Sequence, residues 1–167
     1  TYKGASCIGR AIESLLNQTY KDIEIIVVDD NNPDSLERAE TQNIVEKYFR
    51  NNNLKYIKHE KNLNGAVARN SGIKVATGEF IGFLDDDDYY YDTKIEKCVE
   101  SLNKHKNIEA VFCGVIVTEE KYILNIVNYD TNIENLQKKL LFNVNMFGTG
   151  SNLFLRKECV ENIGGFD

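Results

Sequence analysis

Apolar residues recur along this chain at two different spacings, and the spacing predicts which segments form helices and which form strands. In residues 5–18 the apolar positions lie three or four residues apart, as they do on one face of a helix. Residues 23–28 are a nearly continuous β-branched run, which is typical of a strand buried on both faces. The same patterns predict further helices at residues 35–50, 66–76, 92–106 and 133–142, and further strands at residues 54–59, 80–84, 110–118, 122–127 and 152–156.

Helices and strands alternate with short connections, which predicts an α/β fold with a mostly parallel sheet between two layers of helices. The strand at 110–118 is expected to turn back into the strand at 122–127 as a hairpin. The chain has no repeat and no low-complexity linker, so residues 1–167 are expected to form a single domain. Because a crossover helix normally follows a parallel strand, we expect the chain to begin just after a strand.

Composition excludes several classes of protein. The 167 residues carry a net charge of −6 and no basic stripe with interleaved aromatic residues, which argues against binding to nucleic acid. No apolar run is long enough to span a membrane. The four cysteines are scattered without a CxxC pair and there are two histidines, so free thiols in a reducing cytoplasm are expected rather than a zinc site.

Four consecutive aspartates, Asp85 to Asp88, directly follow the apolar run at residues 80–84. Two unit charges about 4 Å apart repel by about 4 kcal/mol at an effective dielectric constant of about 20. A folded protein keeps such a cluster if the cluster is well solvated or if it holds a cation. The position at the end of a buried strand favours the cation, and oxygen-rich sites suit Mg²⁺ or Mn²⁺. The alternative is a solvated acidic turn.

A second acidic group, Asp29 and Asp30, ends the strand at residues 23–28. Because the carboxyl ends of parallel strands share one edge of a sheet, we expect both acidic groups to face one crevice. Ordinary turn chemistry is the alternative for this pair. Arg69 lies near the start of the next helix at the same edge, where its planar fork can bind a phosphate or pair with a neighbouring aspartate.

Carboxylates, a divalent cation and an arginine together describe a site for a diphosphate. The sequence has neither GxGxxG after a strand nor GxxxxGK[ST], which excludes a dinucleotide-dependent oxidoreductase and a P-loop enzyme. Other residues carry weaker signals. His59 ends a predicted strand and can reach the crevice, although nothing in the sequence requires it, and Tyr89 to Tyr91 are expected to pack in the core rather than to stack on a ligand.

Five segments in order resemble the family 2 glycosyltransferases of the GT-A fold, a Rossmann-like fold that binds nucleotide-diphosphate sugars. They are AIESLLNQTY at 11–20, IEIIVVDD at 23–30, ARNSGI at 68–73, ATGEFIGFLDDDD at 76–88 and GGFD at 164–167. The likeness spans almost the whole chain. Three departures are Lys3, where the family usually has asparagine, Asn64, where it usually has glycine, and Asp92, where proline is common.

The resemblance implies a role for each matching residue. Thr1 and Tyr2 would line the nucleoside pocket, Asp30 would hydrogen-bond the base of the donor, usually uracil, and Arg69 would lie beside the nucleotide. In the D-x-D motif, Asp85 would face the ribose or the donor sugar, Asp86 would fill the variable and solvated middle position, and Asp87 would bind Mn²⁺ or Mg²⁺ on the diphosphate.

The implied reaction moves a sugar from a nucleotide-diphosphate sugar, usually a UDP-sugar, to a hydroxyl of a glycan or lipid-linked acceptor, with inversion. Its expected setting is bacterial cell-surface polysaccharide synthesis, in the cytoplasm or at the inner face of the membrane. The general base of the family usually follows the GGFD segment, so it is expected beyond Asp167 and no catalytic residue is assigned. The chain thus looks cut at both ends, without the first strand and the acceptor half.

Two other functions fit parts of this pattern. A phosphoacceptor signalling domain also places aspartates at strand ends around Mg²⁺, but it lacks the hairpin predicted here and has no acidic tetrad. A degenerate transferase fragment would bind a nucleotide without catalysing any reaction.

Overall fold

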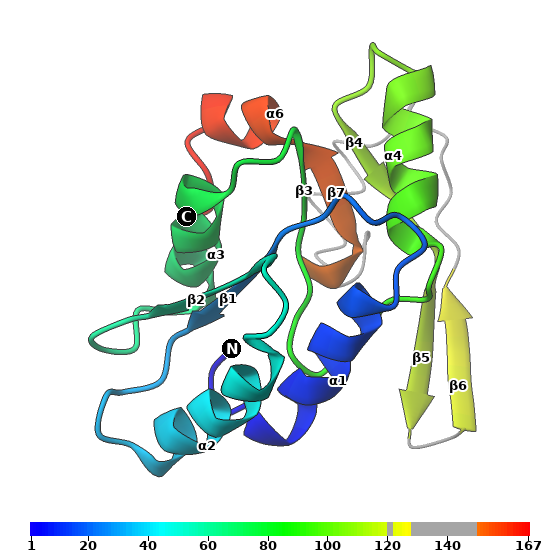
Figure 1. The fold of residues 1–167 in the computed structure, drawn as a ribbon. Coiled ribbons are helices and arrows are strands. Elements are labelled where there is room, and N and C mark those ends of the chain that lie inside the picture. The colour runs from blue at the N-terminus through cyan, green and yellow to red at the C-terminus, as the bar shows by residue number, and fades with distance from the viewer. Residues whose placement is uncertain (120–121, 128–149) are drawn as a thin grey trace.

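The computed structural model describes residues 1–119, 122–127 and 150–167, and Figure 1 shows how their helices and strands are arranged. The helix expected at residues 35–50 is an α-helix at Leu36–Val45 followed directly by a 3₁₀ turn at Glu46–Tyr48. The helix expected at residues 133–142 lies outside the described residues. Four α-helices form where the periodicity predicts them: α1 (Ala5–Leu16), α2 (Leu36–Val45), α3 (Gly65–Val75) and α4 (Lys94–Lys104). A further short helix is α6 (Lys157–Asn162).

The strands are β1 (Ile25–Asp29), β2 (Leu54–Lys58), β3 (Phe80–Gly82), β4 (Ala110–Phe112), β5 (Val115–Glu119), β6 (Tyr122–Val127) and β7 (Leu153–Arg156). β1 and β2 pair in parallel, as expected, whereas β7 pairs antiparallel with both β3 and β4. β5 and β6 form the expected antiparallel hairpin. The α/β fold is confirmed, but antiparallel pairing is more common among the described strands than we expected, because β7 enters between β3 and β4 in the opposite direction.

The segment expected as a single strand at residues 110–118 is two strands. Cys113 and Gly114 interrupt it, so β4 pairs with β7 and β5 pairs with β6. The prediction of one strand was wrong because periodicity cannot show that a chain changes its pairing partner within an apolar run.

Side chains of β1 point alternately to the two faces of the sheet. Ile25 and Val27 pack with Ile12 of α1 in one apolar cluster. On the other face, the Val28 side chain lies against α3, where a Cβ atom on Gly72 would be 3.6 Å from it. A strand buried on both faces needs this kind of cover, which explains the continuous β-branched run in its sequence.

The residues of β7 alternate in the same way. Phe154 packs with Leu102 and other buried residues of α4, whereas Leu155 packs with Ile73 of α3 and Val160 of α6. Helices α1, α2 and α4 therefore cover one face and α3 and α6 cover the other, as in Figure 1. This is the three-layer α/β/α arrangement that the sequence predicts.

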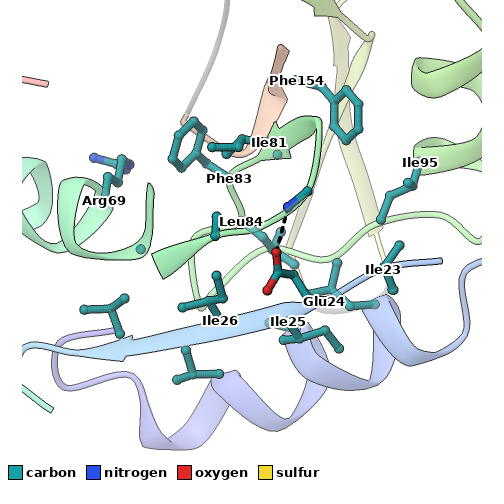
Figure 2. Close-up of a pocket in the computed structure, with 18 of the residues that line it drawn as sticks. Ile23, Glu24, Ile25, Ile26, Arg69, Ile81, Phe83, Leu84, Ile95 and Phe154 are labelled. Atoms are coloured by element: carbon teal, nitrogen blue, oxygen red, sulfur yellow. Dashed lines mark hydrogen bonds between the residues drawn. The ribbon is translucent and has the colours of Figure 1, made fainter. Parts of the chain in front are cut away.

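A cavity of about 880 Å³ separates β1 from β3. Figure 2 shows that much of its wall is apolar, with Ile26 on one side and Ile81 and Leu84 on the other. Thr1 pairs with β1 beside this cavity, because its terminal ammonium donates to the Val28 carbonyl oxygen (2.6 Å) and its own carbonyl accepts from the Asp30 N–H (2.9 Å). This pair of bonds is the pattern of a residue in a parallel strand.

Candidate functional site

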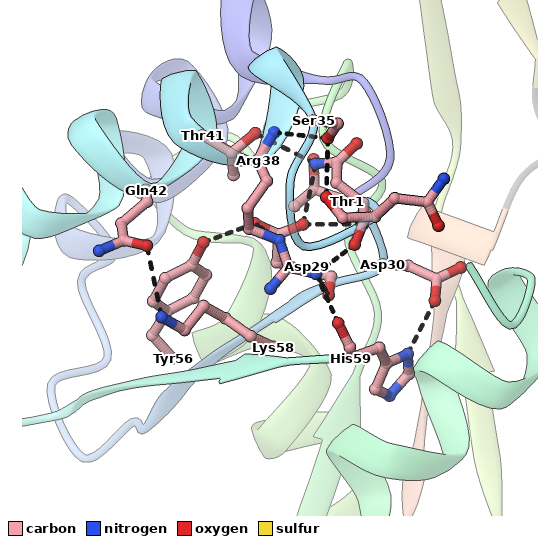
Figure 3. A network of polar contacts seen from close by, with 12 residues as sticks. Thr1, Asp29, Asp30, Ser35, Arg38, Thr41, Gln42, Tyr56, Lys58 and His59 are labelled. Carbon is pink, nitrogen blue, oxygen red and sulfur yellow. Dashed lines mark hydrogen bonds and ion pairs between the residues drawn. The ribbon is translucent and has the colours of Figure 1, made fainter. Parts of the chain in front are cut away.

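The two aspartates at the end of β1, Asp29 and Asp30, have different surroundings. Asp29 is fully buried, and one of its carboxylate oxygens accepts hydrogen bonds from the backbone N–H (2.9 Å) and side-chain amide (2.8 Å) of Asn31. The other oxygen accepts from the Tyr56 hydroxyl and lies 3.4 Å from the Arg38 Nε. Burial and the neighbouring carboxylate raise the pKa of Tyr56, so its hydroxyl stays a donor. Asp29 therefore holds the loop after β1 in place (Figure 3).

Arg38 is a buried arginine that the sequence does not single out. Its Nη2 lies within hydrogen-bond reach of the carbonyl oxygens of Asp29, Asn31 and His59, which joins the ends of β1 and β2. Ser35 sets its position, since the Ser35 hydroxyl caps α2 by accepting from the Arg38 N–H at 3.1 Å. An arginine on an amphipathic helix usually faces solvent, so no local signal marks this one.

Asp30 is 3% exposed and its carboxylate accepts three hydrogen bonds from the protein. Oδ1 accepts from the His59 Nδ1 at 2.7 Å and from the Leu63 N–H at 2.8 Å, and Oδ2 accepts from the Asn62 side-chain amide at 3.0 Å. A carboxylate offers about four acceptor positions. Among the described residues, Asn62 is the one donor to Oδ2, so its second position is open to a donor from a ligand.

Thr1 and Tyr2, expected in the nucleoside pocket, lie in different surroundings. Thr1 is bonded to the Asp30 N–H through its carbonyl oxygen, and its hydroxyl is buried without a hydrogen-bond partner in the part of the chain that the structure describes. Such a hydroxyl is stabilised by a ligand that supplies a partner. Tyr2 is 49% exposed and its ring lies 5.4 Å from the Lys3 ammonium.

The second acidic group follows β3 in a turn that α3 and the segment before β7 hold in place. Asp85 accepts a hydrogen bond from the Arg69 Nη2 at 2.8 Å, so the arginine–aspartate pair considered from the sequence does form. The Asp85 N–H donates to the Ser151 hydroxyl at 2.9 Å. The Asp88 N–H closes the turn by donating to the Asp85 carbonyl oxygen at 3.1 Å.

Asp86 connects the two acidic groups in space. A Cβ atom on Gly4 would lie 2.0 Å from an Asp86 carboxylate oxygen and 2.7 Å from the Thr1 hydroxyl oxygen. The Asp86 carboxylate and the side chain of Thr1, whose backbone pairs with the end of β1, therefore border the same small space. The structure thus brings the two acidic groups to one edge of the sheet, and Asp86 is half-buried there rather than fully solvated.

Asp87 is exposed, and its backbone carbonyl oxygen accepts from an Arg10 Nη2. No donor among the described residues contacts its carboxylate, and the described residues contain no cluster of three or more metal-binding side chains. Mg²⁺ is usually bound by one or two carboxylates together with substrate phosphates. Asp87, with Asp85 beside it, fits an ion of that kind.

Tyr90 helps to hold the acidic turn after β3 in place. The Tyr90 hydroxyl lies 2.6 Å from the Phe83 carbonyl oxygen and 2.9 Å from that of Ser151, so it joins β3 to the segment before β7. Tyr90 is buried, which confirms the expected packing role, but Tyr89 and Tyr91 are exposed.

Two of the three departures from the family pattern, Lys3 and Asn64, have a positive φ, whereas Asp92 does not. Lys3 has φ of 58° and Asn64 has φ of 77°, in the region that glycine and asparagine adopt most easily. The Asn64 side chain caps α3 by accepting from the N–H groups of Ala66 (3.0 Å) and Val67 (3.1 Å). Asparagine therefore serves both the turn and the start of the helix that carries Arg69.

The profile of the family described as Glycosyl transferase family 2 matches residues 1–164. WfaP of Escherichia coli, named a UDP-Glc:alpha-D-GlcNAc-diphosphoundecaprenol beta-1,3-glucosyltransferase, is 37% identical over 105 residues, which are 63% of this chain and 39% of WfaP. The chain spans about half or less of the length of the curated relatives it matches. None of the described helices is long and apolar enough to cross a membrane.

Solved structures support the same fold. S. aureus TarS 1-349 in complex with UDP superposes with a TM-score of 0.73 at 22% identity, covering 98% of this chain and 46% of that one. The mannosyltransferase PcManGT from Pyrobaculum calidifontis, in complex with GDP-Man and Mn²⁺, superposes with a TM-score of 0.71 at 20% identity, covering 100% of this chain and 45% of that one. The GT-A fold expected from the motifs is confirmed, and the chain belongs to glycosyltransferase family 2.

Proposed function

We propose that the crevice between the ends of β1 and β3 binds a nucleotide-diphosphate sugar, a UDP-sugar, and that the protein transfers the sugar to an acceptor hydroxyl with inversion. One observation carries the proposal: Thr1 and Asp86 border the same space, so that the Asp30 end of β1 and the acidic turn after β3 lie side by side. One donor molecule can then contact both.

The roles follow from the chemistry that each residue offers. The open acceptor position of Asp30 suits an N–H of the base, and the unpartnered hydroxyl of Thr1 and the exposed ring of Tyr2 suit the nucleoside. Arg69, 30% exposed in its side chain and bonded to Asp85, offers its remaining N–H groups to the diphosphate. Asp85 and the half-buried Asp86 adjoin the ribose and sugar end in this assignment.

A divalent ion, Mn²⁺ or Mg²⁺, belongs to the proposal. Asp87 would hold it, with Asp85 beside it and phosphate oxygens of the donor completing its coordination. When bound, the ion neutralises the negative charge that develops on the departing nucleoside diphosphate. The proposal names donor-binding residues only, and the base that takes the acceptor proton is expected beyond Asp167.

The related proteins support the choice of substrates. The name of WfaP gives UDP-glucose as donor and a diphosphoundecaprenol-linked sugar as acceptor, and the PcManGT structure contains a GDP-sugar together with Mn²⁺. For this chain we correspondingly propose a UDP-sugar as donor and a glycan or lipid-linked molecule as acceptor. The proposed process is bacterial cell-surface polysaccharide synthesis, in the cytoplasm or at the inner face of the membrane.

The cavity between β1 and β3 is a different kind of space from the donor crevice. Its walls along the strands are mostly apolar. Arg69, the cationic residue that suits a diphosphate, lies at the end near Thr1 and Asp85, whereas the carboxylate of Glu24 lines another part of the cavity. Thr1 already pairs with β1 as a strand residue does. We propose that the apolar part accepts an extended segment preceding Thr1, as a strand between β1 and β3, and that the donor binds only at the polar end.

The proposed function is tested by calorimetric titration with UDP and Mn²⁺, followed by an assay for hydrolysis of UDP-sugars. We expect metal-dependent UDP binding and release of UDP from at least one UDP-sugar. Binding without hydrolysis of any tested donor would favour a non-catalytic nucleotide-binding module. A stable aspartyl phosphate after treatment with acetyl phosphate, without UDP binding, would favour a signalling domain and contradict the proposal.

A further inference from the structure

His59 lies between Asp30 and Ser71 and bonds to both. Its Nδ1 is 2.7 Å from the Asp30 Oδ1, and its Nε2 is 2.8 Å from the Ser71 hydroxyl oxygen. The three residues come from the end of β1, the residue after β2, and α3, and Figure 3 shows the contact between His59 and Asp30. The His59 side chain is 9% exposed. The imidazole is therefore held between these two side chains and is not a surface group.

The hydrogen-bond partners determine which imidazole nitrogen carries a proton. An ionised carboxylate can only accept, so the Nδ1 facing Asp30 must be an N–H donor. The Ser71 hydroxyl can donate to Nε2 or accept from it, so it satisfies the imidazole in either protonation state. The backbone holds the imidazole as well, because the His59 N–H donates to the Asp29 carbonyl oxygen at 3.0 Å.

This arrangement restricts the Asp30 carboxylate. Oδ1 is occupied by His59 and Leu63, and Oδ2 by Asn62, so the carboxylate cannot rotate without breaking one of these bonds. Asp30 is therefore held in one orientation, with its open position on Oδ2.

We propose that His59, oriented by Ser71, is a positioning residue that makes the crevice select a base with a ring N–H, and so prefer uracil to cytosine. This inference rests on the proposed function, in which Asp30 contacts the base. Uracil has an N–H at ring position 3, where cytosine has a lone pair. A fixed acceptor pairs with the first and repels the second, whereas a carboxylate that rotates or takes up a proton accommodates both. Sites built around one fixed hydrogen bond discriminate far better than apolar pockets do.

The test compares UDP with CDP, which differ in the base alone. Dissociation constants for both are measured by calorimetry in Mn²⁺ for the unmodified chain, H59F, H59N and S71A. We expect UDP to bind about tenfold or more tightly than CDP in the unmodified chain. The ratio should fall to within about threefold of unity in H59F, and it should fall partway in S71A. H59N should restore most of the preference, because its amide N–H replaces Nδ1–H beside Asp30.

His105 gives the matched control, because it is an exposed histidine at the end of α4. H105F should leave the UDP:CDP ratio unchanged. Circular dichroism and thermal melting identify any variant that does not fold, and in the unmodified chain NMR of a ¹⁵N-histidine sample should show Nδ1 of His59 protonated. Ratios that stay at the unmodified value in folded H59F and S71A, or a His59 protonated on Nε2 alone, would overturn the inference while leaving the proposed function intact. Failure of the unmodified chain to bind UDP would overturn both.

Discussion

Replacing Asp29 with asparagine should destabilise the protein far more than the same change at its neighbour Asp30. Asp29 is fully buried beside Arg38, which is 7% exposed in its side chain, and asparagine would leave that guanidinium without a counter-charge. Breaking a buried ion pair by removing one partner costs about 3–5 kcal/mol. The contact here is 3.4 Å long and Arg38 keeps its carbonyl partners, so we expect the lower end, about 3 kcal/mol.

No lysine or arginine pairs with Asp30 among the described residues, and the two donors at its Oδ1 can also bond to an amide oxygen. Asp30→Asn should therefore cost about 1 kcal/mol, the net value of a typical hydrogen bond. Urea unfolding followed by circular dichroism measures both changes, and at a slope of about 1–3 kcal/mol/M the Asp29→Asn midpoint should fall by about 1–3 M. The reasoning is refuted if Asp29→Asn lies within about 1 kcal/mol of the unmodified chain, or if Asp30→Asn is the more damaging change.

Three further predictions follow from other parts of the structure. Burial would raise the pKa of Glu24, but hydrogen bonds from Lys55 and from backbone N–H groups lower it to about 2. The Glu24 carboxylate should therefore add about 1 kcal/mol to the free energy of unfolding above pH 4.5, compared with the Glu24→Gln variant. Urea titrations at several pH values should show this difference disappearing between pH 4.5 and 2. The Cys98 thiol, whose sulfur is 3.6 Å from that of Cys113, lowers the pKa of Cys113, so iodoacetamide should alkylate Cys113 at a lower pH than a free cysteine, and Cys98→Ala should raise that pH. Adding five alternating valines and threonines before Thr1 should raise the melting temperature by filling the cavity between β1 and β3, whereas five residues with a central proline should not.

Local patterns predicted the parts of the fold that depend on one face of one element. The apolar spacing predicted a helix at residues 92–106, and the apolar residues that repeat at that spacing in α4, Ile95, Cys98, Val99 and Leu102, are all buried. The position of β7 was beyond such reasoning. β7 pairs with β4, which lies more than 40 residues earlier in the chain, and with β3, which lies earlier still. The alternation of apolar residues within a strand does not show which strands are its neighbours or in which direction they run.

The candidate site shows the same division. The strand-end rule predicted that Asp30 and the turn at residues 85–88 face one edge, and the structure places them there. The unequal surroundings of Asp29 and Asp30 were not predicted, because the difference comes from Arg38, which reaches Asp29 from α2. His59 was recognised only as a residue that can reach the crevice, since its partners Asp30 and Ser71 lie 29 and 12 residues away along the chain and come from other elements.

The central claim is that the exposed carboxylate of Asp87 and the nucleoside-facing Asp30 bind two ends of one donor. The most direct test is the affinity for UDP with Mn²⁺ and with EDTA, measured by calorimetry for the unmodified chain and for Asp87→Asn. We predict that Mn²⁺ strengthens UDP binding about tenfold or more in the unmodified chain and has almost no effect in Asp87→Asn, because the ion joins that carboxylate to the diphosphate. An equal gain from Mn²⁺ in both proteins would contradict the account.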